Sequence, residues 1–159
     1  LQQADHHYIW RLLDTLGGAL PEIGVGFNSY GAYASVNHLH FHLFMRARPL
    51  PIVAADWTHN GGDTDYPAQC HRFDDEADAW RFIQELHGRR VPYNLVGLPG
   101  RLYCLPRLPQ GMRELPAWSG GYAWYEMAGC CVPQGKEAFQ TLQEAQLRTE
   151  LEAVSAVSG

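Results

Sequence analysis

The stretch that decides the fold is "YASVNHLHFHLF", residues 33–44. Its three histidines alternate with three apolar residues, in the order His38, Leu39, His40, Phe41, His42 and Leu43. Successive side chains of an extended strand point to opposite faces, so the imidazoles would share one face and the apolar side chains would be buried on the other. A helix would scatter the histidines around its circumference. We therefore predict a β-strand over 36–45 with a chemical site on one face.

Three histidines on one face suit either a metal ion or covalent catalysis. Rings two residues apart can share a zinc ion, but the Cα atoms of His38 and His42 would lie about 13 Å apart along a strand. A single ion would therefore need ligands from elsewhere, for which His59 and His71 are the candidates. Alternatively, the middle ring of His40 attacks phosphorus, because imidazole is partly unprotonated near neutral pH. The histidines alone leave both chemistries open.

Short polar residues surround the three histidines in the sequence. Ser35 and Asn37 lie just ahead of the first histidine, and Asn28 ends the preceding predicted strand, 23–28. Together with the amides of the glycine-containing turn at 29–34, they would offer neutral hydrogen-bond donors to phosphate oxygens. The catalytic interpretation uses these neighbours, whereas the metal interpretation gives them no role.

The segment "SVNHLHFHLF" resembles the signature of the histidine triad (HIT) superfamily, with Ser35 three residues ahead of the first histidine. Three later segments occur in the order found in the GDP-L-galactose/GDP-D-glucose phosphorylase branch: "LPIV", "VPYNLVGLPGRLYCLPR" and "WYEMAGCCV". They are also similar to diadenosine tetraphosphate phosphorylases and galactose-1-phosphate uridylyltransferases. The resemblance covers residues 20–155. It implies an α+β fold with a HIT-like antiparallel sheet and flanking helices.

The resemblance also implies a role for each residue of the site. His40 would be the nucleophile that forms a nucleotidyl-histidine intermediate, and His38 would support and orient its ring. His42 would contact the phosphate or the leaving group. Ser35 would bind a phosphate oxygen, and Asn28 would reach the same phosphate or the catalytic ring.

Two further substrate contacts are expected near the site. Asn37 stands beside the triad, and Arg107 in "LPR" would hold a phosphate unless it is a solvated strand end. Glu126 lies in an apolar segment, where we expect it to make a structural hydrogen bond. Asn94 is expected to be a buried amide bonded to the backbone. The tryptophans are assigned to packing rather than base stacking, namely Trp57, Trp80, Trp118 and Trp124.

The implied function is that of a nucleotidyltransferase or phosphorylase acting on a nucleoside diphosphate sugar or a dinucleotide. The substrate is a nucleotide or nucleotide sugar, and phosphate is the acceptor. Two alternatives remain: a HIT-type nucleotide hydrolase, and a metal-binding or non-catalytic nucleotide-binding module. Phosphorylases of this superfamily mostly carry Gln where this chain has His42. The histidine favours water as the acceptor of the nucleotidyl group, whereas the longer resemblance favours phosphate as the acceptor. We expect no cofactor held by the protein, and Mg²⁺ only together with substrate phosphates.

The composition bears on the partners, the location and the cysteine chemistry of the protein. The net charge is −5 and Lys136 is the only lysine, so no basic cluster predicts a nucleic-acid partner. No apolar run has the length of a membrane span, and we expect a cytoplasmic protein. The four cysteines are predicted to be reduced thiols: Cys70, Cys104, Cys130 and Cys131.

Residues 1–159 are predicted to form one HIT-like catalytic domain, either whole or part of a longer chain. Only 37 residues precede His38, so we expect a second subunit to complete the nucleoside site and predict a homodimer. The sequence also predicts helices at 4–16 and 74–90 and a hairpin at 93–107. A last strand is predicted at 122–133, and a C-terminal helical region from 135.

Overall fold

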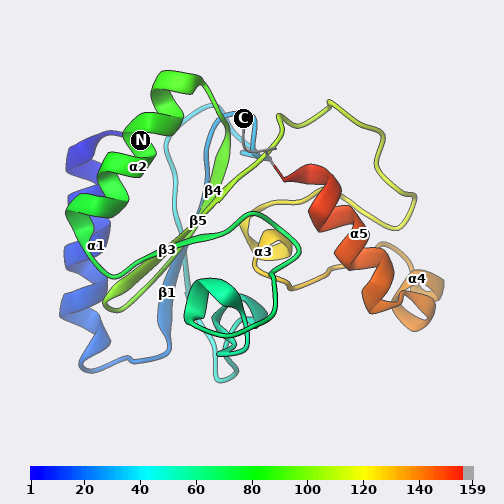
Figure 1. The fold of residues 1–159 in the computed structure, drawn as a ribbon, viewed down its shortest axis with the longest axis horizontal. Helices are drawn as coiled ribbons and strands as arrows, with labels where there is room; N and C mark the ends of the chain where they lie inside the picture. The colour runs from blue at the N-terminus through cyan, green and yellow to red at the C-terminus, as the bar shows by residue number, and fades with distance from the viewer. Residues whose placement is uncertain (156–159) are drawn as a thin grey trace.

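The protein is built around a five-stranded antiparallel sheet, shown in Figure 1. The computed structural model describes residues 1–155. The strands are β1 (Ile23–Asn28), β2 (His42–Met45), β3 (His71–Phe73), β4 (Tyr93–Leu98) and β5 (Arg101–Pro106). They lie in the order β2-β1-β4-β5-β3, which makes β2 one edge of the sheet and β3 the other. The predicted α+β class and HIT-like antiparallel sheet are thus observed.

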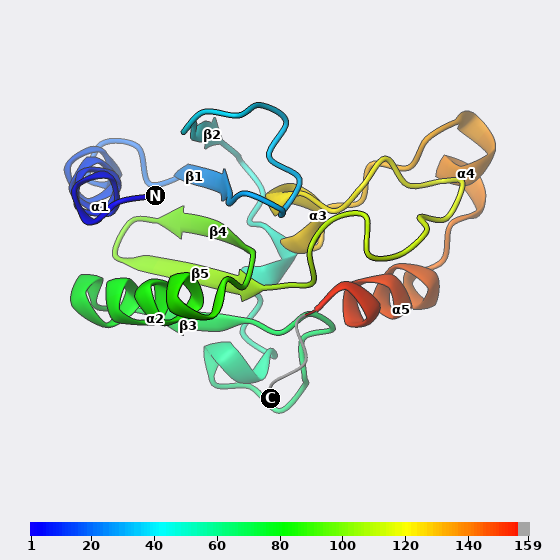
Figure 2. The same ribbon diagram turned by 90° about the horizontal axis from the view of Figure 1, so that it is seen from above.

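Two helices cover one face of the sheet, as Figure 2 shows. The helix α1 (Gln3–Gly17) places Ile9 and Leu13 against β1, and α2 (Glu76–Arg89) packs Ile83 against β4 and β5. The carboxylate of Asp75 caps α2 by accepting hydrogen bonds from two backbone amides of its first turn. These helices, the strand at 23–28 and the hairpin at 93–107 confirm the sequence predictions.

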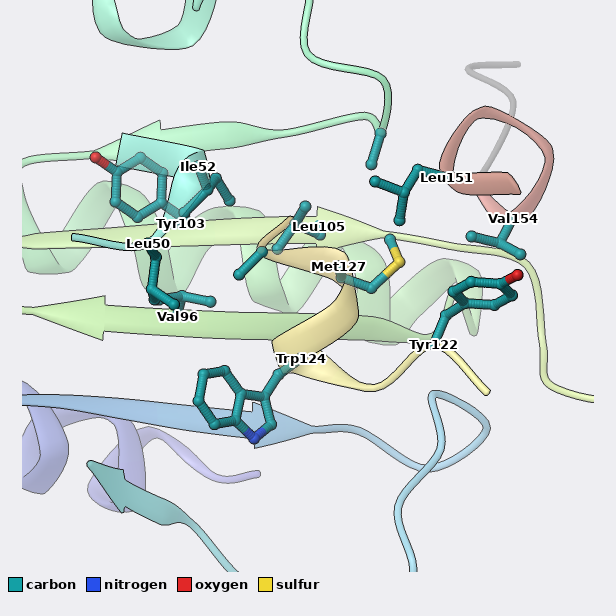
Figure 3. Packing of buried hydrophobic residues seen from close by; sticks show 12 residues of the cluster. Leu50, Ile52, Val96, Tyr103, Leu105, Tyr122, Trp124, Met127, Leu151 and Val154 are labelled. Carbon is teal, nitrogen blue, oxygen red and sulfur yellow. The ribbon is translucent and has the colours of Figure 1, made fainter. Parts of the chain in front are cut away.

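The second core cluster lies on the opposite face and is shown in Figure 3. Its residues come from the sheet, from the 3₁₀ turn η1 (Pro51–Val53) and from two helices, α3 (Trp124–Met127) and α5 (Glu144–Val154). Trp124 packs directly on β1, where a Cβ at Gly26 would lie 2.1 Å from the indole. Only glycine therefore allows Trp124 to approach the strand this closely. A short helix α4 (Lys136–Thr141) precedes α5, and the turn η2 (Thr58–Asn60) lies beyond η1.

Two predicted strands are wrong. The strand predicted at 36–45 begins only at His42, because its pairing with β1 stops at the Gly26–His42 pair. The strand predicted at 122–133 is instead the helical turn α3, whose start is stabilised by the carboxylate of Glu126 accepting from the Ala123 amide at 3.1 Å. That bond confirms the structural role expected for Glu126.

The predicted burial of the apolar face of the triad segment is also wrong in part. Leu39, which lies ahead of β2, is 46% exposed, and Leu43 in the edge strand β2 is 59% exposed. Phe41 alone packs inward, with its ring 5.3 Å from that of Phe27. The four cysteines are free thiols, as predicted. No helix within residues 1–155 combines the length and the apolarity needed to cross a membrane.

Candidate active site

The three histidines of the triad lie together at the start of β2. The ring centroids of His38 and His40 are 5.7 Å apart, and those of His40 and His42 are 5.2 Å apart. Only His42 belongs to the strand, whereas His38 lies in a bend and His40 in irregular backbone ahead of it. The side chains of His38 and His42 are exposed, whereas His40 between them is half-buried.

The ring of His40 is oriented by the backbone of His38. Its Nδ1 lies 3.1 Å from the His38 carbonyl oxygen, which can only accept a hydrogen bond. A neutral His40 must therefore carry its proton on Nδ1, which leaves the lone pair on Nε2. Nε2 is shielded from solvent and has no hydrogen-bond partner among residues 1–155. In its neutral form, the middle histidine thus presents a nitrogen with a free lone pair and no hydrogen-bond partner between two other imidazoles.

The neighbouring rings favour a neutral His42. Burial lowers the pKa of His42, and the proximity of His40 lowers it further because two imidazolium charges would repel each other. The other face of the His42 ring meets Trp124, with ring centroids 6.0 Å apart. Trp124 in turn stacks on Phe44, two residues along β2, at 5.0 Å between centroids and 10° between planes. Trp124 therefore packs in the core, as predicted, while also forming one wall beside the triad.

Asn28 is buried below the triad rather than open to a ligand. Its Oδ1 accepts hydrogen bonds from Asn94 Nδ2 and from the Trp124 backbone amide, both at 2.7 Å. Its Nδ2 donates to the Tyr33 carbonyl oxygen at 3.4 Å, and Asn94 Nδ2 also donates to the Ala32 carbonyl oxygen at 3.0 Å. Asn94 is fully buried and bonded to the backbone, as expected. The Asn28–Asn94 pair ties the turn that leads to the triad to β1, β4 and α3.

Arg107 is buried in the same region, with 2% of its surface exposed, so the solvated strand end considered from the sequence is wrong. Its guanidinium donates to the carbonyl oxygens of Tyr122 and Leu108 and lies 5.0 Å from the centre of the Tyr33 ring. Burial lowers its pKa to about 10. None of the ion pairs within residues 1–155 involves Arg107. Its visible role is to hold the loops around the site.

The remaining predicted contacts, Ser35 and Asn37, are exposed on the segment between the turn and the triad. Ser35 borders an open cavity of about 560 Å³ that is also lined by Tyr33, Gln110 and Glu126. Burial raises the pKa of the Glu126 carboxyl group in the wall of this cavity. None of the three triad histidines lines this cavity.

Gln110 is a residue that sequence reasoning missed. Its side-chain Oε1 accepts a hydrogen bond from the Tyr33 backbone amide at 2.6 Å, and its backbone amide donates to the Gly31 carbonyl oxygen at 2.7 Å. It therefore supports Tyr33, which has a φ of 63°, in a left-handed conformation that is rare for a side chain of this size. Nothing in the loop sequence around Gln110 marks it for this role, because its partners lie 77 and 79 positions earlier.

The other histidines considered as metal ligands do not join the triad. His59 Nε2 bonds the Ile52 carbonyl oxygen at 2.8 Å, and the His71 ring bonds the Gln69 side chain at 3.1 Å. His71 is in β3, at the opposite edge of the sheet from β2. In the described part of the chain, no group of three His, Cys, Asp or Glu side chains is arranged to hold a metal ion.

Comparisons with known proteins bear on the fold of the chain. No family model matches the chain. GDP-L-galactose phosphorylase 1 from Arabidopsis thaliana is 46% identical over 37 residues, which are 23% of this chain and 8% of that protein. The crystal structure of yeast Ap4A phosphorylase Apa2 in complex with Ap4A superposes with a TM-score of 0.69 at 14% identity, over 98% of this chain and 64% of that one. The chain thus spans less than two thirds of either protein, and its fold is the HIT-like fold that the sequence predicted.

Proposed function

We propose that this chain carries the catalytic centre of a nucleotide phosphorylase that works through a nucleotidyl-histidine intermediate on His40. The observation that carries the proposal is the contact between His40 Nδ1 and the His38 carbonyl oxygen. The Nδ1 proton of neutral His40 is held by the His38 carbonyl oxygen, so the unengaged Nε2 has the lone pair that a nucleophile needs. The proposed substrate is a nucleoside diphosphate sugar or a dinucleoside polyphosphate.

The first half-reaction transfers the nucleotidyl group to the protein. The Nε2 lone pair attacks the α-phosphorus, the bond from that phosphorus to its bridging oxygen breaks, and the sugar phosphate or nucleotide leaves with the electron pair. The ring becomes positively charged as the phosphorus–nitrogen bond forms, and the Nδ1–H bond to the His38 carbonyl stabilises this charge. Because Nε2 is shielded from solvent, the groups that cover it must move as the substrate enters.

The second half-reaction releases the nucleotide to inorganic phosphate. A phosphate oxygen attacks the same phosphorus, the phosphorus–nitrogen bond breaks, and a nucleoside diphosphate leaves as His40 returns to its neutral form. Ser35, Asn37 and the imidazole N–H groups of His38 and His42 are the donors we assign to the phosphate oxygens. Asn28 and Arg107 are not assigned to the phosphate, because their side chains already make hydrogen bonds within the fold. Their proposed role is to position the turn that carries Ser35.

Hydrolysis is the second candidate, and one observation favours it. His42 stands where phosphorylases of the superfamily mostly carry Gln, and its lowered pKa leaves a neutral ring that can bind water. Both candidates share the first half-reaction, so only the acceptor separates them. The phosphorylase names of the two similar proteins support phosphate as the acceptor.

The test follows products from a panel of nucleoside diphosphate sugars and dinucleoside polyphosphates, with and without inorganic phosphate. Phosphorolysis requires that phosphate accelerate cleavage and appear in a nucleoside diphosphate, which ³¹P NMR resolves. Release of a nucleoside monophosphate at a rate indifferent to phosphate would establish the hydrolase instead. Binding without turnover across the panel would leave only the nucleotide-binding module.

A further inference from the structure

A second cavity lies at the opposite end of β2 from the triad. Its volume is about 470 Å³, and it is bordered by the end of β2, the residues just before β1 and the turn between β4 and β5. Arg46 on its rim lies four positions after His42, which corresponds to about 13 Å of extended chain. The cavity is therefore too far from His40 to hold the phosphorus that this residue attacks.

The floor of this cavity is apolar. Phe44 and Leu98 lie side by side over Gly24 of β1, where a Cβ would be 2.2 Å from the Phe44 ring and 2.9 Å from Leu98. One face of the Phe44 ring stacks on Trp124, which fixes its orientation. Leu50 completes the apolar wall from the segment after β2. A flat or apolar group of a ligand would find a rigid surface here.

The rim of the same cavity is strongly basic. Arg46, Arg48 and Arg101 border it, with Glu22 as the single carboxylate, so the local charge is about +2 in a chain whose net charge is −5. None of the ion pairs formed within residues 1–155 uses these three arginines. Uncompensated guanidinium groups gathered from separate segments indicate an anion site rather than a set of surface ion pairs.

One of the three arginines is already held in place. The Arg46 guanidinium donates to the Tyr125 hydroxyl group and to the Arg48 carbonyl oxygen, the latter at 3.3 Å, and it lies 5.3 Å from the centre of the Tyr125 ring. These contacts fix one edge of the guanidinium without neutralising its charge. Arg48 is exposed, and Arg101 lies beside the Tyr103 hydroxyl group. Part of the entropic cost of ordering these side chains around an anion is therefore already met.

We propose that this cavity binds an organic phosphate, with its phosphate between the three guanidinium groups and its aromatic or apolar part on Phe44 and Leu98. Planar guanidinium groups match phosphate oxygens in pairs, which a lysine could not do. The cavity volume lies within the range of about 300 to 1,000 Å³ typical of small-molecule sites. The site goes beyond the proposed function and does not depend on it, because it shares no residue with the triad.

The test is a titration of the ¹⁵N-labelled protein with adenosine 5′-monophosphate, followed by NMR. Saturable shifts are expected for the amides of Phe44, Arg46, Leu98 and Arg101, separate from any shifts at the triad. Adenosine alone and inorganic phosphate alone should each bind at least about tenfold more weakly, because each fills only half of the site. Phosphate binding as tightly as the nucleotide would overturn the role of the apolar floor.

Charge-removing variants make the assignment specific. Arg48→Gln and Arg101→Gln should each weaken the nucleotide shifts at this cavity by about tenfold, since each variant removes a charged hydrogen-bond donor to the phosphate. Arg89→Gln is the matched control, because Arg89 is an exposed arginine at the end of α2, on the other face of the sheet. Equal effects in all three variants, or shifts confined to the triad, would overturn the site. Dispersion of the amide spectrum reports whether each variant remains folded.

Discussion

Replacing Asn28 with Ala is expected to destabilise the fold and to impair the site together. The substitution removes an Oδ1 atom that accepts two hydrogen bonds of 2.7 Å, one from Asn94 Nδ2 and one from the Trp124 amide. Both donors are buried, and each buried donor left without a partner costs about 1 to 3 kcal/mol. The sum is about 2 to 6 kcal/mol. We expect about 2 to 4 kcal/mol, because a water molecule can enter the space of the lost amide.

The assay is urea or thermal unfolding followed by circular dichroism. For a chain of this length each kcal/mol lowers the melting temperature by about 2 to 4 °C, so Asn28→Ala should lower it by about 4 to 16 °C. Asn37→Ala is the matched control, since Asn37 is exposed in the segment beside the triad and its loss should stay within about 0.5 kcal/mol. An equally small effect of Asn28→Ala would refute the reasoning.

The same variant should lose activity at temperatures where it remains folded. Asn28 holds the Tyr33 carbonyl oxygen and, through Asn94, the Ala32 carbonyl oxygen, so the turn ahead of Ser35 loses its support. A destabilised variant with undiminished turnover would show that this turn does not position the site.

Four further predictions concern the site and the assembly. His40→Ala should lower turnover at least about a thousandfold without unfolding the protein, because the covalent path is lost, and near-normal activity would contradict the mechanism. Activity should survive chelation when assayed with fresh Mg²⁺, whereas stoichiometric zinc whose removal abolishes turnover would favour the metal interpretation. Light scattering should detect a dimer that Leu43→Lys weakens, because Leu43 is 59% exposed on an unpaired edge strand, and a fully active monomer would be decisive against it. Burial lowers the pKa values of His59 and His71, so the unfolded chain takes up protons on them first as the pH falls below about 6.5. The free energy of unfolding should therefore decline from pH 7.5 to 5.5, and an unchanged urea midpoint would argue against this linkage.

The triad could be predicted from the sequence because its signal is local. Alternation of histidine with apolar residues is visible within seven positions and survives in any extended backbone, whether or not it is paired in a sheet. The ends of the strand were not predictable, since they depend on β1, a partner whose pairing with β2 stops at Gly26. The exposure of Leu43 likewise depends on strand order, because the same sequence in a central strand would be buried.

Residues whose partners lie far along the chain were the ones misread. The segment around Trp124 has the aromatic and apolar content of a strand, but its backbone amide bonds the side chain of Asn28, 96 positions earlier, and a helical turn results. Arg107 is enclosed by carbonyl groups that include that of Tyr122, which no local pattern could supply. The arginines around the second cavity look scattered in the sequence, and only the sheet brings Arg46 and Arg101 together.

The part of the strand prediction that failed bears directly on the proposed chemistry. Because the ladder between β1 and β2 ends at His42, the segment from His38 to Phe41 has no partner strand within the described residues. The His38 carbonyl oxygen is therefore available to accept a hydrogen bond from Nδ1 of His40. That bond selects the tautomer with the lone pair on Nε2, the atom that the proposed mechanism requires. An irregular backbone ahead of the strand is thus what orients the proposed nucleophile, with the flanking imidazoles beside it.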